Sequence, residues 1–84
     1  MADDAIEIYD LKGLNCPLPV LKAKKRLAGM QPGRRIWLET TDPLAVIDIP
    51  AFCNEEAHRL IEMAAVDGFH RFLVERGAWM RPLP

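Results

Sequence analysis

The sequence has little of what would mark a membrane protein or a disulfide-stapled secreted protein. Only 2 of its 84 residues are cysteine, which is too few for a disulfide framework. No apolar run approaches the ~20 residues that span a bilayer, and residues 1–4 are acidic rather than signal-like. We therefore expect no membrane association and a reducing, cytoplasmic setting in which cysteine stays free.

The residues that bind metals are also few and badly spaced. The possible metal ligands are Cys16, Cys53, His58 and His70. They form neither a C-x-x-C nor an H-x-x-x-H pattern, so we expect neither a metal site nor a cofactor. Half of the residues are apolar and the net charge is −1, which is typical of a small folded domain rather than a disordered chain.

Acidic residues are absent between Leu11 and Leu38, although the chain has 12 of them elsewhere. The same span is rich in basic residues, so one region of the surface should be strongly positive, and it contains Cys16. The basic residues of the span are Lys12, Lys22, Lys24, Lys25, Arg26, Arg34 and Arg35.

Apolar periodicity predicts two helices. The first runs from Pro17 to about Gly29, with Gly29 as its C-cap. Pro50 interrupts the second helical pattern, so we expect a short turn at residues 43–47 and a separate helix over residues 50–57.

Alternating and β-branched stretches predict four strands, at residues 6–10, 34–40, 60–66 and 69–76. Asp67-Gly68 is a strong two-residue hairpin signal. The order β-α-β-α-β-β, with right-handed crossovers, predicts an α/β (α+β) two-layer sandwich: a mixed four-stranded sheet with both helices on one face. Trp37 should then lie on the open face.

Cys16 stands between the first strand and the first helix, in the run Gly13-Leu14-Asn15-Cys16-Pro17-Leu18-Pro19. Pro17 suits the first helical position, which makes Cys16 the cap residue. Unpaired N–H groups and the helix dipole favour a thiolate there. We therefore predict an exposed, activated thiol with a pKa below its ordinary value, supported by the loop and by the N–H groups of Leu18 and Val20.

This run resembles the Cys-Pro-x-Pro signature of the TusA family of sulfur-carrier proteins. Three further segments resemble the family's other motifs in the same order: Met30-Gln31-Pro32-Gly33, Thr41-Asp42-Pro43 and Asp48-Ile49-Pro50-Ala51-Phe52-Cys53. The resemblance covers about residues 6–76. It implies the same two-layer fold. The chain length allows a single domain over residues 1–84, and the two prolines of residues 77–84 favour a tail there.

The resemblance also implies a function. Cys16 would accept a sulfane sulfur as a persulfide from a donor such as a cysteine desulfurase and pass it to a downstream acceptor protein. Such a carrier is a sulfurtransferase only in the sense that it passes on sulfur, while its partner enzymes supply the remaining chemistry. The motifs do not distinguish tRNA thiolation, sulfur oxidation and cofactor assembly.

The basic span predicts a docking face for an acidic partner, formed by Lys12, Lys22, Lys25 and Arg26. It lacks interleaved acids, which a salt-bridged surface helix would have. Direct nucleic-acid binding is not favoured, because Trp37 is its only aromatic residue.

Other reactive side chains have simpler interpretations. Cys53 lies among apolar neighbours and should be a buried core thiol. Asp42 and Asp48 should be helix caps, and His58 should interact with a helix end or solvent. Two other functions stay open: a regulatory module in which Cys16 is incidental, and a redox pair of Cys16 and Cys53.

Overall fold

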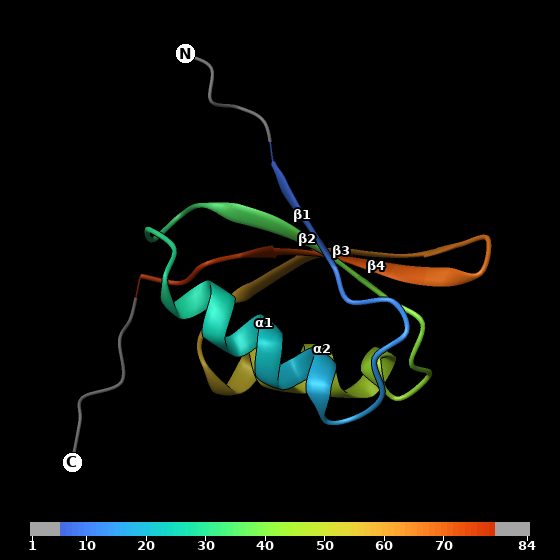
Figure 1. The fold of residues 1–84 in the computed structure, drawn as a ribbon. Coiled ribbons are helices and arrows are strands. Elements are labelled where there is room, and N and C mark those ends of the chain that lie inside the picture. The colour runs from blue at the N-terminus through green and yellow to red at the C-terminus, as the bar shows by residue number, and fades with distance from the viewer. Residues whose placement is uncertain (1–5, 79–84) are drawn as a thin grey trace.

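A four-stranded sheet carries two helices on one of its faces (Figure 1). The computed structural model describes residues 6–78. The elements follow the predicted order: β1 (Glu7–Asp10), α1 (Leu18–Ala28), β2 (Arg35–Thr40), α2 (Ala45–Glu55), β3 (Arg59–Val66) and β4 (Phe69–Glu75). This confirms the predicted two-layer sandwich. Most of the predicted tail falls on residues 79–84, which lie outside the described residues.

The sheet is mixed, as predicted, with the strand order β1-β2-β4-β3. β1 pairs with β2 in parallel, and β4 pairs with both β2 and β3 in antiparallel fashion. The turn between β3 and β4 is the predicted Asp67-Gly68 hairpin, in which Gly68 has a φ of +89°. Only glycine adopts this conformation without strain.

The core lies between the sheet and the two helices. Ile36, Leu38 and Thr40 of β2 are all buried, as their alternation predicts. They pack with apolar side chains from β4 and both helices, chiefly Ala23, Leu27, Ile49, Phe52, Phe72 and Val74. Trp37 faces the other side of the sheet, where the Arg71 guanidinium carbon lies 4.1 Å from its ring centroid and covers it in part.

In β1, the alternating pattern does not show which side chains face the helices. Tyr9 packs against the core and Leu11 is buried, whereas Ile8 is 57% exposed. Successive side chains of a strand point to opposite faces, so Tyr9 and Leu11 share the inner face and Ile8 must take the outer one. The alternation predicted the strand correctly but could not say which set faces the helices.

The prediction of a turn followed by a separate helix around Pro50 is wrong. α2 is one helix from Ala45 to Glu55 and runs through Pro50, instead of a turn followed by a separate helix. Proline removes one internal hydrogen bond, the one its N–H would donate to Val46. The buried residues of α2 lie on both sides of the proline, so their burial along one continuous stripe outweighs that loss; they are Ala45, Ile49, Phe52 and Cys53.

Candidate functional site around Cys16

The Cys16 loop is fixed at its β1 end. The Leu11 N–H donates to the Glu39 carbonyl at 2.8 Å, and the buried Leu11 side chain anchors the chain. Gly13 has a φ of +87°, which suits glycine, and its N–H donates to Thr41 Oγ1 at 2.8 Å. The loop is therefore tied to β2 and to the segment that leads into α2.

At its other end the loop enters α1 one residue later than predicted. Pro17 occupies the cap position rather than the first helical position, so Cys16 precedes the cap. The Cys16–Pro17 peptide bond is cis. The Leu18 N–H, predicted to face the sulfur, donates instead to the Asn15 carbonyl at 2.8 Å. Pro19 is buried within the first turn and anchors the start of the helix.

Cys16 is exposed, and its Sγ donates a hydrogen bond to Asp48 Oδ2 at 3.3 Å. Asp48 lies in the first turn of α2. This hydrogen bond, together with partial desolvation and the charges of Asp48 and Asp42, raises the pKa of the Cys16 thiol. The predicted lowering of that pKa is wrong, because the carboxylates of Asp48 and Asp42 disfavour the thiolate and α1 begins only at Leu18.

The two acidic residues predicted as caps differ in role. Asp42 precedes α2, and its Oδ1 accepts the Leu44 N–H at 3.2 Å, but the cap residue of the helix is Leu44 itself, so the prediction of Asp42 as the cap is wrong. Asp48 lies inside the helix and faces the thiol, so its prediction as a cap is wrong. Cys16 and Asp48 are 32 residues apart in the chain, and no local spacing signals such a contact.

A groove between α1 and α2 begins beside the thiol. Its lining includes Pro17 and Val20 from the start of α1, and Asp48, Ala51, Phe52 and Glu55 from α2. Three apolar side chains near the starts of the two helices are exposed: Leu18, Leu44 and Ile47. The sulfur thus lies at the edge of a partly apolar surface.

The chain matches the family described as sulfurtransferase TusA over residues 7–76. A sulfur carrier protein TusA of Allochromatium vinosum is 41% identical over 76 residues, covering 90% of this chain and 99% of that protein. A protein of Neisseria meningitidis serogroup A is 42% identical over 69 residues, covering 82% of this chain and 93% of the relative. The chain belongs to the TusA family.

A solved structure shows the same fold. A SirA-like protein from Desulfitobacterium hafniense superposes with a TM-score of 0.76 at 22% identity, covering 86% of this chain and 99% of that one. TusA membership confirms the predicted role in a sulfur relay, which implies a sulfur donor and a sulfur acceptor as partners.

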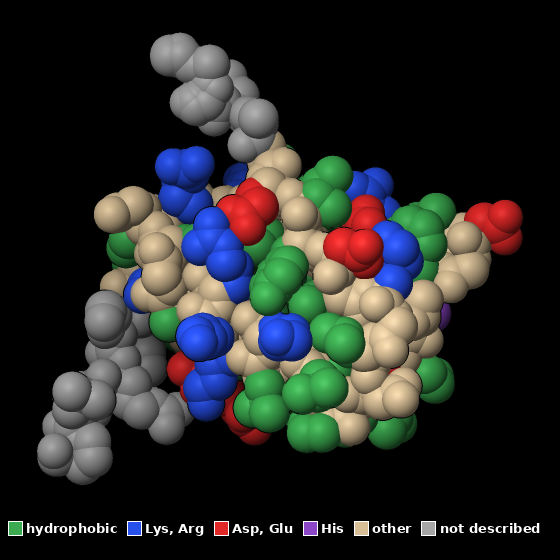
Figure 2. All heavy atoms as spheres, viewed as in Figure 1, with side chains coloured by type: hydrophobic (Ala, Val, Ile, Leu, Met, Phe, Trp, Pro, Cys, Tyr) green, Lys and Arg blue, Asp and Glu red, His purple; other side chains and the backbone are tan. Residues whose placement is uncertain are grey.

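The four basic residues predicted to dock a partner of this TusA protein fall into two pairs. Lys12 is engaged by Glu39 at 2.9 Å and Asp10 at 3.2 Å. Arg26 is engaged by Glu7 on β1. Lys22 and Lys25 are exposed and form no ion pair within residues 6–78. Figure 2 shows basic side chains gathered over the C-terminal half of α1, with apolar ones toward its start.

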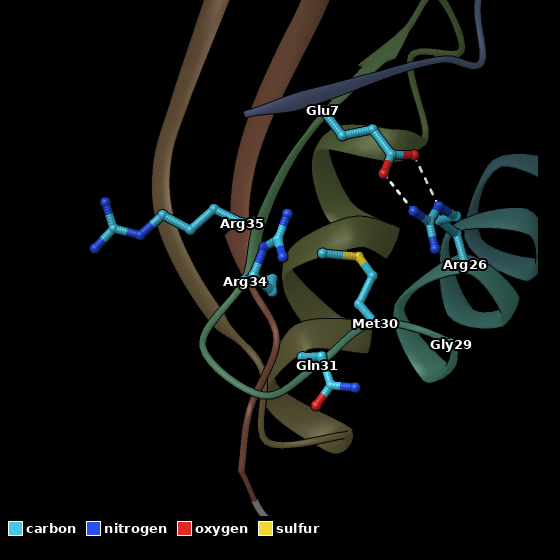
Figure 3. A pocket seen from close by; sticks show the side chains of 7 residues that line it. All are labelled: Glu7, Arg26, Gly29, Met30, Gln31, Arg34 and Arg35. Atoms are coloured by element: carbon cyan, nitrogen blue, oxygen red, sulfur yellow. Dashed lines mark hydrogen bonds and ion pairs between the residues drawn. The ribbon is translucent and has the colours of Figure 1, made fainter. Parts of the chain in front are cut away.

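A second hollow, at the C-terminal end of α1, is lined by three arginines and by Glu7 (Figure 3). Glu7 neutralises Arg26, and Glu75 binds Arg35 Nε at 3.1 Å. Arg35 points away from the other lining residues. The negative end of the α1 dipole also disfavours an anion here.

Cys53 is a buried core residue, as predicted. It is 2% exposed, and burial raises its pKa to about 11. His58 differs from its prediction: its Nδ1 accepts the Gly77 N–H at 3.0 Å, and its ring lies 5.3 Å from that of Phe52. It therefore joins the end of α2 to the chain after β4.

Two further observations concern the described part of the chain alone. Its His, Cys, Asp and Glu side chains form no group of three that could hold a metal ion. Neither helix in residues 6–78 is long and apolar enough to cross a membrane.

Proposed function

We propose that this protein carries sulfane sulfur as a persulfide on Cys16, which it receives from a donor protein such as a cysteine desulfurase and delivers to the thiol of an acceptor protein. The single observation that carries this proposal is the exposure of Cys16 on a fixed loop, at the motif by which the chain resembles sulfur carriers. A carrier needs an accessible sulfur that two different partners can reach in turn.

The chemistry balances without an oxidant or reductant. The Cys16 sulfur attacks the terminal sulfur of the donor's persulfide, the donor's S–S bond breaks, and the donor leaves as a thiolate that regains a proton. Delivery repeats the exchange: the acceptor's thiolate attacks the terminal sulfur on Cys16, and Cys16 leaves as the thiolate. A reducing cytoplasm suits this cycle, because it keeps both thiols free between transfers.

The structure supports a docking role for Lys22 and Lys25 more strongly than for Lys12 and Arg26. Lys22 and Lys25 border a hollow beside Tyr9 on the α1 face, and neither is neutralised within residues 6–78. Lys12 and Arg26 already have carboxylate partners. We propose that an acidic patch of the partner meets Lys22 and Lys25, and that the relay needs no direct contact with nucleic acid.

A redox pair of Cys16 and Cys53 has less support. Cys53 is nearly inaccessible, and its raised pKa keeps it protonated at neutral pH, so it is a poor nucleophile.

Intact-mass measurement tests the proposal. After incubation with a cysteine desulfurase and free cysteine, the protein should gain the mass of at least one sulfur atom, which a reductant removes. Cys16→Ser should abolish the gain and Cys53→Ser should retain it. Loss of the gain in Cys53→Ser alone would overturn the site assignment. A disulfide would instead lose two hydrogens and need both cysteines, and a regulatory module would show no change.

A further inference from the structure

The contact between Cys16 and Asp48 joins a surface sulfur to a fixed carboxylate. Cys16 is exposed, whereas Asp48 is half-buried in the first turn of α2, where its N–H donates to the Leu44 carbonyl at 2.9 Å. The helix therefore fixes the backbone of Asp48, and its carboxylate accepts the hydrogen bond of the thiol at 3.3 Å.

In the described part of the chain, the Asp48 carboxylate has no basic side chain as a partner. Within residues 6–78, none of the ion pairs between basic and acidic side chains involves Asp48 or Asp42. Asp42 is occupied by the Leu44 N–H. Asp48, from α2, and Asp42, from the segment before it, are the charged groups that act on the thiol. The site is thus locally negative, although Cys16 belongs to the basic span of the sequence.

We propose that Asp48 is a catalytic residue for sulfur transfer: its carboxylate binds the resting Cys16 thiol and accepts the thiol proton while the sulfur attacks the donor's persulfide. This inference rests on the proposed carrier function. In the loading step the S–H proton passes to Asp48 Oδ2, and the sulfur electron pair forms the new S–S bond. The donor leaves as a thiolate, to which Asp48 then returns the proton.

The same carboxylate has a use after loading. A persulfide anion beside Asp48 would meet like charge, which favours the neutral S–SH form. The neutral form has the terminal sulfur that an acceptor thiolate can attack, whereas an anionic sulfur repels it. Asp48 therefore keeps the free carrier unreactive toward small electrophiles and the loaded carrier ready to deliver.

The variant Asp48→Asn separates this role from a merely structural one. Iodoacetamide alkylation of Cys16 reads thiolate formation across pH, and single-turnover loading from a persulfidated desulfurase reads transfer. Removing the carboxylate should lower the pH at the midpoint of alkylation. Each unit by which the thiol pKa falls raises the thiolate fraction near pH 7 about tenfold. Loading should fall several-fold, because the proton acceptor is lost. The opposite signs of the two changes are the signature of the proposed role.

Glu55→Gln is the matched control, since it removes one carboxylate from the same helix and the same groove, and Glu55 is not among the groups that raise the pKa of Cys16. It should leave the alkylation profile unchanged. If Asp48→Asn alkylates with the wild-type profile, or if alkylation and loading change in the same direction, the proposal is overturned. If the wild-type protein itself takes no sulfur, the carrier function fails and the transfer role with it, while alkylation still reports the coupling of Asp48 to Cys16.

Discussion

Arg26 of α1 and Glu7 of β1 form a two-point ion pair in which Arg26 Nε donates to Glu7 Oε2 at 2.7 Å and a second guanidinium nitrogen binds the other carboxylate oxygen. The contact lowers the pKa of Glu7 and raises that of Arg26. It joins the helix to the edge strand of the sheet. A residue that looked available for a partner in the sequence is thus occupied within the fold.

Arg26 and Lys12 are bound by carboxylates of the same chain, whereas the docking role proposed for Lys22 and Lys25 can be tested by charge reversal. Lys22→Glu and Lys25→Glu should each slow sulfur loading several-fold at low salt and flatten its dependence on ionic strength, because steering by surface charge is screened by salt. Arg59→Glu, an equal charge change on β3 at the other end of the strand order, should have little effect. If all three variants slowed loading equally, the effect would come from the net charge of the protein and not from a docking surface at Lys22 and Lys25.

His58 predicts a pH dependence of stability. Burial and the charge of Arg76 lower the pKa of His58 below its ordinary value of 6.5, and a protonated Nδ1 could not accept the Gly77 N–H. The folded state therefore favours the neutral ring. The contribution of His58 is fully present above pH 6.5 and is lost as the pH falls through the lowered pKa.

Urea unfolding of the wild type and of His58→Asn between pH 5 and 8 measures this contribution. Asparagine keeps an acceptor near the Nδ1 position but does not titrate, so the variant should lose less stability on acidification than the wild type. Identical pH slopes for the two proteins would contradict the role assigned to His58.

Gly77 has no room for a side chain. A Cβ built there would lie 2.0 Å from the Ala57 carbonyl oxygen, so Gly77→Ala must displace backbone and should cost about 1–3 kcal/mol. Gly29→Ala is the control, because its nearest contact would be 3.6 Å away and its φ is −91°. Urea midpoints compare the two; similar midpoints would show that the chain after β4 adapts freely.

Sequence patterns were enough to predict the order of the helices and strands, and they singled out Cys16 as the candidate carrier of sulfur. Some features depend only on residues that are close in sequence, so the sequence pattern predicts them directly. They are the alternation in β2, the apolar stripe of α1 and the Asp67-Gly68 turn. The burial of Cys53 followed from its apolar neighbours in the same way. Cys16 was identified from the prolines around it and from the family motif.

The pKa of Cys16 and the ion pairing of the basic residues could not be predicted from the sequence, because they depend on contacts between distant segments. The thiol's acidity depends on Asp48, 32 residues away, and the availability of Arg26 depends on Glu7, 19 residues away. The continuity of α2 through Pro50 was settled by the burial of Ile49 and Phe52 against the sheet. An interior proline such as Pro50 costs a helix about 3 kcal/mol, and a helix dipole typically contributes about 0.3–1 kcal/mol. Contacts between segments far apart in the sequence override both effects here.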